Sequence, residues 1–140
     1  MSNSPQIVNY AILRYLPYVE TGEFVNVAVV AHTLSPHWCG HAWADEDVER
    51  ITHFFPSVKR ELYQVQKSAF LAELNRVEKL IKITPDRRLS LSIFTELTRP
   101  RESLFRFGEI RTGIADEPAS FTAQLCNDYV NPRLEPLVAR

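Results

Sequence analysis

Polar side chains interrupt the two most apolar stretches near the start of the chain. Arg14 falls within residues 7–16, Asn26 falls within residues 24–33, and Glu23 directly precedes the second stretch. A guanidinium or an amide in an apolar environment is costly unless it is hydrogen-bonded. We therefore expect the fold to give these groups partners. One interpretation is structural, with Glu23 paired to Arg14; the other is a preorganised polar site that binds an anion or a peptide group.

A second candidate region lies between residues 86 and 111, where arginines outnumber acidic residues. Phe105 and Phe107 alternate there with Arg106, and arginine beside aromatic residues on a strand is typical of proteins that bind single-stranded nucleic acid. On a strand, however, the two phenylalanines point away from Arg106 and are expected to face the core. Nucleic-acid binding is therefore an alternative interpretation, and it would use three arginines: Arg99, Arg101 and Arg106.

A third pattern could bind a metal ion. His37, Cys39 and His41 alternate, so on a strand all three side chains leave the same face. Such a His-x-His pair can bind zinc, and His32 could approach from a neighbouring strand. No second cluster of cysteine and histidine supports the site. The alternative interpretation is a partly exposed strand face that carries two histidines.

Other chemistries have little support in the sequence. The four glycines are not clustered, so the glycine-rich loop that binds phosphate groups is excluded. No Gly-x-Ser-x-Gly motif is present. Cys126 lies within an amphipathic segment and is expected to be a small core residue. The sequence predicts no catalytic residue and no cofactor.

Composition indicates one ordinary globular domain that spans residues 1–140. The hydrophobic fraction is 45% and the charged fraction is 24%, with a net charge of -1. This balance argues against a general binder of polyanions. The two cysteines, Cys39 and Cys126, do not form a disulfide framework. The polar residues 1–6 do not resemble a signal peptide, and no apolar run is long enough to span a membrane. We expect a cytoplasmic protein.

Alternating apolar residues predict the strands of an antiparallel sheet. The first two strands are expected to form a hairpin through a loop around Gly22. A third strand is plausible, and a fourth alternates from Ser103 to Thr112. The predicted strands are residues 7–16, 24–33, 38–44 and 103–112.

Helical spacing of apolar residues predicts the helices. Asp45 is a suitable N-cap for the first helix, and Ser57 can cap the next. In that next segment Val58, Leu62, Val65 and Ala69 form one apolar stripe, and a second, shifted stripe includes Phe70, Leu74, Val77 and Ile81. Residues 85–97 fit a helix, although their alternation fits a strand almost as well. Pro118 opens the last helix. The expected architecture is α+β, with helices packed on an antiparallel sheet of about four strands.

Four motifs resemble a known family. They are residues 10–17, 22–30, 97–103 and 111–118. Together they resemble domain-of-unknown-function family 3037, a bacterial family of small proteins, over about residues 10–130. The hallmark positions of the family map here to Arg14, Glu23, Asn26, Arg111, Thr112 and Gly113. Ala28 stands where a glycine is common in the family, and the trio of His37, Cys39 and His41 is outside the pattern.

The resemblance implies no established activity. Members of the family often look like small companions of a kinase-like protein similar to the HipA toxins. This implies an accessory or regulatory role in a toxin–antitoxin or defence setting, with a HipA-like kinase as the protein partner. It also suggests that Arg14, Glu23, Asn26 and Arg111, with Thr112, converge into one polar cluster if their strands are neighbours.

The leading functional hypothesis from the sequence is a non-catalytic interaction module. The alternative is an enzyme or a nucleic-acid-binding protein that uses this cluster, with Glu23 as a base and Arg14 and Arg111 stabilising negative charge. The sequence leaves open whether the chain forms a homo-oligomer.

Overall fold

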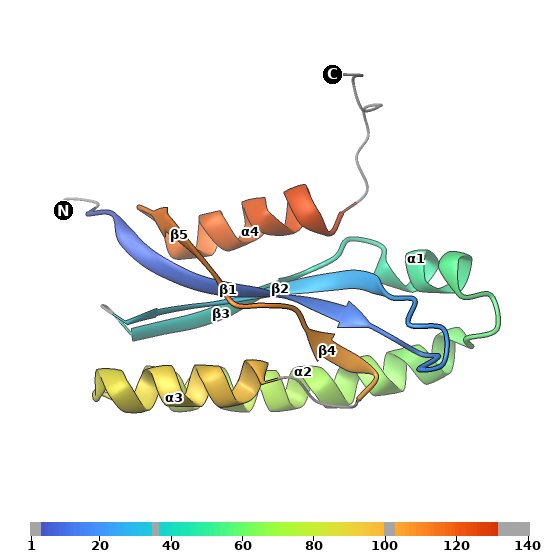
Figure 1. The fold of residues 1–140 in the computed structure, drawn as a ribbon, viewed down its shortest axis with the longest axis horizontal. Coiled ribbons are helices and arrows are strands. Elements are labelled where there is room, and N and C mark those ends of the chain that lie inside the picture. Colours follow the sequence, from blue (N-terminus) through green and yellow to red (C-terminus); the bar gives the residue numbers. More distant parts are fainter. Residues whose placement is uncertain (1–3, 35–36, 100–102, 132–140) are drawn as a thin grey trace, which may run out of the picture.

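The sheet forms the middle layer of the structure, with helices on both of its faces. The computed structural model describes residues 4–34, 37–99 and 103–131. Within these residues α4 (Pro118–Tyr129) lies on one face, and α2 (Arg60–Lys82) and α3 (Arg87–Thr98) lie on the other (Figure 1). The short helix α1 (Asp47–Phe54) lies at one end of the sheet. The prediction of an α+β fold is confirmed.

The described residues form a five-stranded antiparallel sheet with β1 (Gln6–Tyr15) at its centre. On one side β1 pairs with β2 (Val25–Leu34), which pairs with β3 (His37–Trp43). On the other side β5 (Arg111–Ala115) pairs with the first half of β1, and β4 (Phe105–Phe107) pairs with its second half. The predicted fourth strand, 103–112, is therefore two short strands. Pairing of the first short strand with β1 ends at Gly108, whose N–H donates to the carbonyl oxygen of Ile12 at 2.9 Å. Pairing with β1 resumes at Arg111.

The first hairpin forms as predicted because its residues alternate between two apolar faces. Val8, Leu13 and Val30 are completely buried, as expected for strands that are covered on both sides. Gly22 has a φ of 70° in the connecting loop, a conformation that glycine adopts without steric cost. A register shift after Leu13 places Arg14 directly opposite Asn26.

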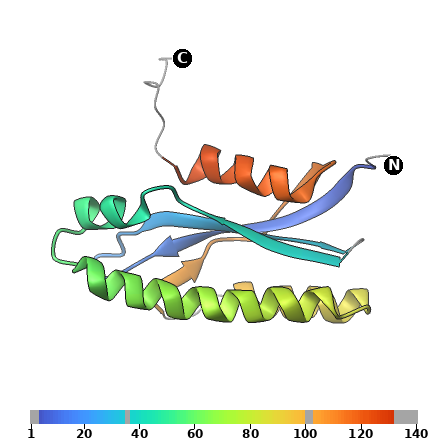
Figure 2. The same ribbon diagram turned by 180° about the vertical axis from the view of Figure 1, so that it is seen from behind.

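The antiparallel pair α2 and α3 covers one face of the sheet, and α2 runs along much of its length (Figure 2). Leu74, Val77 and Ile81 of α2 pack with Phe94 of α3 and Val30 of β2 in one buried cluster. The helical prediction for residues 85–97 is confirmed. α3 is capped at its start, where the side chain of its N-cap residue accepts hydrogen bonds from two backbone N–H groups.

The first predicted stripe of α2 is wrong. The side chains of Leu62 and Val65 are 52% and 68% exposed, whereas Tyr63 between them is completely buried. Tyr63 takes the inward position because its ring packs against the sheet while its hydroxyl donates to the carboxylate of Asp47 at 2.7 Å. The predicted N-caps, Asp45 and Ser57, are also wrong. The N-cap of α1 is Glu46, whose backbone is in the left-handed conformation, and the N-cap of α2 is Lys59.

Asp47 anchors α1 to the sheet and to α2. Its carboxylate also accepts a hydrogen bond from Trp43 Nε1 at 2.8 Å and pairs with Lys67 Nζ at 2.8 Å. Burial alone would raise the pKa of Asp47, but the donors from Lys67, Tyr63 and Trp43 outweigh it and lower this pKa. The network therefore holds a charged carboxylate in the interior at neutral pH.

The helix α4 covers the other face, where Leu125 and Cys126 pack on Val8 and Val29. Phe121 lies so close to Gly113 of β5 that a Cβ atom there would be 2.6 Å from the ring. Only glycine allows this approach of helix and strand. None of the helices within the described residues is both long and apolar enough to cross a membrane.

Candidate functional site

A row of polar residues crosses the sheet on the α4 face. Arg14 of β1 lies opposite Asn26 of β2 on one side and opposite Arg106 of β4 on the other. We call Asn26, Arg14 and Arg106 the arginine row. All three side chains leave the same face, because their neighbours Leu13, Tyr15 and Phe105 point to the α2 face.

The guanidinium of Arg14 is fixed by apolar and backbone contacts. It stacks over the ring of Phe24, with 4.4 Å between Cζ and the ring centroid. Directly after β4, a Cβ atom at Gly108 would lie 3.1 Å from a terminal nitrogen of Arg14, so the glycine leaves room for the Arg14 side chain. Arg14 Nε is buried and has no hydrogen-bond partner.

Asn26 connects the row to the end of α4. Its Nδ2 donates to the backbone carbonyl oxygen of Tyr129 at 3.2 Å, while its Oδ1 is buried and has no partner. A buried donor and a buried acceptor are thus both unsatisfied at neighbouring positions of the row. Buried polar groups in folded proteins usually have partners, so this pair calls for a physical explanation.

The rest of the predicted cluster joins the row only in part. Arg111 leaves the same face from β5, and its guanidinium lies 5.9 Å from the ring centroid of Tyr129. Thr112 points to the opposite face, where its hydroxyl donates to Asn9 Oδ1 at 3.2 Å. Glu23 is exposed, and among the described residues it forms no ion pair with Arg14. The predicted pairing of Glu23 with Arg14 is therefore wrong.

The predicted metal site does not form within the described part of the chain. His37, Cys39 and His41 share the α2 face of β3 as expected, but both histidines have other partners. His37 Nε2 donates to the carbonyl oxygen of Pro85 at 2.7 Å, and His41 Nδ1 pairs with Glu78 at 2.5 Å. Burial and the nearby Glu78 raise the pKa of the Cys39 thiol well above its usual range. No group of three or more metal-ligating side chains occurs among the residues described.

Of the three arginines proposed for nucleic-acid binding, Arg99 and Arg106 both line the groove described below, and nucleic-acid binding stays a prediction. Arg99 pairs with Glu96 at 3.5 Å on α3, whereas Arg106 belongs to the arginine row and donates from Nε to the carbonyl oxygen of Ser103 at 2.9 Å. Arg101 lies outside the described residues. Phe105 and Phe107 face the core, as the alternation predicted.

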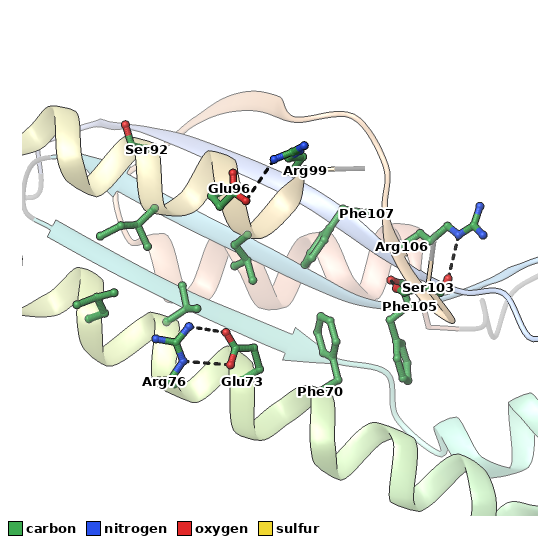
Figure 3. Close-up of a pocket in the computed structure, with 14 residues that line it drawn as sticks. Phe70, Glu73, Arg76, Ser92, Glu96, Arg99, Ser103, Phe105, Arg106 and Phe107 are labelled. Carbon is green, nitrogen blue, oxygen red and sulfur yellow. Dashed lines mark hydrogen bonds and ion pairs between the residues drawn. The ribbon is translucent and has the colours of Figure 1, made fainter. Parts of the chain in front are cut away.

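An apolar groove of about 610 Å³ lies between α2 and α3 (Figure 3). Phe70, Val77 and Leu80 of α2 line one wall, Ile93 and Leu97 of α3 line the other, and Phe105 and Phe107 of β4 lie at one end. The groove was not predicted from the sequence. Its lining residues were interpreted as core positions, and only the separation of the two helices shows that they line an open surface.

Each rim of the groove carries an acid and a base. On α2, Arg76 donates to Glu73 at 2.5 and 3.0 Å, and on α3 Arg99 pairs with Glu96 (Figure 3). These pairs are exposed, so each contributes little to stability. The arrangement can bind an apolar surface that is flanked by charges of both signs.

The fold and the site define a small α+β domain with an apolar groove and, among the residues described, no carboxylate ion-paired with the arginine row. The chain matches the family described as "Protein of unknown function (DUF3037)" over residues 10–130, and it belongs to that family. No curated protein and no solved structure matches the chain.

Proposed function

We propose that this chain is a non-catalytic accessory module of the bacterial cytoplasm, and that the groove between α2 and α3 binds an amphipathic helix of a protein partner. The observation that carries the proposal is the groove itself. Its size is typical of a binding site, and it presents partly exposed aromatic and aliphatic side chains between two charged rims.

A helix is the occupant that best fits this shape and charge. The groove runs between two antiparallel helices, so a third helix can pack its apolar face on Val77, Leu80 and Ile93 by ordinary ridge-and-groove contacts. The partner's flanking residues would then exchange ion pairs with Glu73 and Arg76 on α2. We infer a partner helix with an apolar stripe bordered by acidic and basic side chains.

A partner to test comes from the resemblance described in the sequence analysis, which implies a companion of a HipA-like kinase. We propose that the chain regulates such a kinase in a toxin–antitoxin or defence setting. The expected mode of action is docking, with no chemistry performed by this chain.

Calorimetric titration of the purified chain with the purified HipA-like kinase tests the proposal. Leu80→Glu places a charge in the groove and should weaken binding by about 30-fold or more, the effect of losing an interface hot spot. Leu62→Glu makes the same substitution at an exposed position of the same helix outside the groove, and it should leave affinity unchanged. If the two variants lose affinity equally, the groove is not the interface. If the unmodified chain does not bind the kinase, the kinase is not the partner.

A further inference from the structure

We propose that the arginine row binds the phosphate group of a small phosphorylated ligand that also carries a hydroxyl group, such as a nucleotide or a sugar phosphate. The row leaves the α4 face of the sheet, and its member Arg106 also lies at the border of the groove between α2 and α3. The inference does not rest on the proposed partner, because its observations are contacts within this chain.

The first observation is a pair of like charges. Arg14 and Arg106 are direct cross-strand partners on one face, a position where two cations destabilise a sheet. Neither forms an ion pair with any residue that the structure describes. A dianion bound between the two guanidinium groups would turn this repulsion into attraction on both sides.

The second observation is that both guanidinium groups are held in place. Arg14 is fixed by the ring of Phe24 and by the close backbone at Gly108, and Arg106 is fixed through its Nε by the carbonyl of Ser103. Their terminal nitrogens remain as donors. Arginine presents its donors as a planar fork that matches the oxygens of a phosphate, so two such side chains from paired positions of neighbouring strands can bind one phosphate group.

The third observation is the unsatisfied acceptor beside these donors. Asn26 Oδ1 is buried without a partner, and its amide nitrogen is already used by the carbonyl of Tyr129. The oxygens of a fully ionised phosphate monoester only accept hydrogen bonds, so they cannot satisfy this atom. A further hydroxyl group of the ligand can donate to it after a small rotation of the Asn26 side chain, and this favours a phosphorylated ligand with such a hydroxyl over a simple phosphate monoester.

Two acidic residues line a shallow pocket beside Arg14 and Gly108. Glu96 is paired there with Arg99, and Glu109 is exposed. Its carboxylate lowers the positive potential near Arg14 without forming an ion pair with it. Glu109→Gln should therefore tighten phosphate binding.

Proton–nitrogen NMR of the full chain tests the site, because it resolves the Nε–H groups of individual arginines. In a buffer of low ionic strength, inorganic phosphate should shift the Arg14 and Arg106 signals to saturation at millimolar concentration. Arg106→Gln should weaken binding by about tenfold or more, the loss expected for one charge-assisted hydrogen bond. Arg88→Gln, at an exposed position of α3, should bind as the unmodified chain does.

Three phosphate esters then define the ligand. Glycerol 3-phosphate and adenosine 5′-monophosphate carry hydroxyl groups and should bind more tightly than methyl phosphate, which has none. If glycerol 3-phosphate binds more tightly, the ligand is of the sugar-phosphate class, and if adenosine 5′-monophosphate binds more tightly, the ligand is a nucleotide. Equal affinity for all three esters would overturn the role of Asn26.

Two results would overturn the proposal as a whole. One is the absence of a saturable shift at Arg14 and Arg106, or an equal loss of binding in Arg106→Gln and Arg88→Gln. The other is a free protein in which Arg14 Nε–H already donates to Asn26 Oδ1 and is unmoved by phosphate. Arg106 lies on a short edge strand, so Arg106→Gln keeps the test valid if substitutions at Arg14 prevent folding.

Discussion

The buried imidazole of His32 should make the folded state sensitive to mild acid. The side chain is completely buried between β2 and α3, where it stacks on Phe94 with 5.0 Å between ring centroids. Its Nε2 lies 2.7 Å from Ser90 Oγ, whereas its Nδ1 is buried and has no partner. Protonation would therefore add a positive charge and a second N–H donor to a site that offers one hydrogen-bond partner.

Burial, with a smaller electrostatic contribution from His37, lowers the pKa of His32 from 6.5 to about 4. An unfolded chain keeps the ordinary histidine pKa of about 6.5. Between these two values the unfolded state binds a proton that the folded state does not. Stability is thus fully present above pH 6.5 and is lost as the pH falls towards 4. From pH 7.5 to pH 5 the loss is about 2 kcal/mol, from roughly 1.4 kcal/mol for each pH unit below 6.5.

Urea unfolding at several pH values between 7.5 and 5 measures this loss. His32→Gln keeps a group that can hydrogen-bond to Ser90 but cannot be protonated, so it should lose about 2 kcal/mol less than the unmodified chain over this range. His53→Gln, at an exposed position of α1, should retain the unmodified dependence on pH. If His32→Gln shows the same dependence as the unmodified chain, His32 is not the acid-sensitive group.

Three further predictions concern stability and reactivity. Asp47→Asn should lower the free energy of unfolding by about 2–3 kcal/mol in urea, because it leaves a partly buried ammonium without its counter-charge; a loss below about 1 kcal/mol would contradict the network. Gly113→Val should cost about 2 kcal/mol in a thermal melt through its clash with Phe121, and an unchanged melting temperature would refute that contact. Burial raises the pKa of both cysteine thiols, that of Cys126 to about 11, so a thiol reagent at pH 8 should label Cys39 and Cys126 slowly in the folded chain and fast in urea. Fast labelling of both thiols without urea would contradict this burial.

The strands were predictable because their local pattern agrees with their environment. Residues 7–16 and 24–33 alternate between two apolar faces, and only a strand covered on both sides buries both. The last predicted strand was divided in the structure. Its alternation continues through Phe105 and Phe107, but the chain leaves β1 after Gly108 and pairs with it again from Arg111, and a pattern of apolar residues does not show where a strand leaves its partner.

The candidate site was predictable only in part, since it depends on strand order. That Arg14 and Asn26 share a face follows from the hairpin, which the sequence indicates. That Arg14 also faces Arg106 follows from the pairing of β1 with β4, and no local signal reveals a contact between such distant segments. The buried Tyr63 shows the same limit, because its inward position depends on a hydrogen bond to Asp47 in another helix.

The central position of β1 has a consequence for how the chain is made. One edge of β1 pairs with β2 from the same hairpin. Its other edge stays unpaired until residues 105–115 have left the ribosome, which happens much later. During synthesis the nascent chain therefore exposes an apolar strand edge for most of its translation. Contacts this far apart in sequence also slow the search for the native pairing after release. The unpaired edge of β1 in this hairpin is thus the segment of the nascent chain that a chaperone is expected to bind.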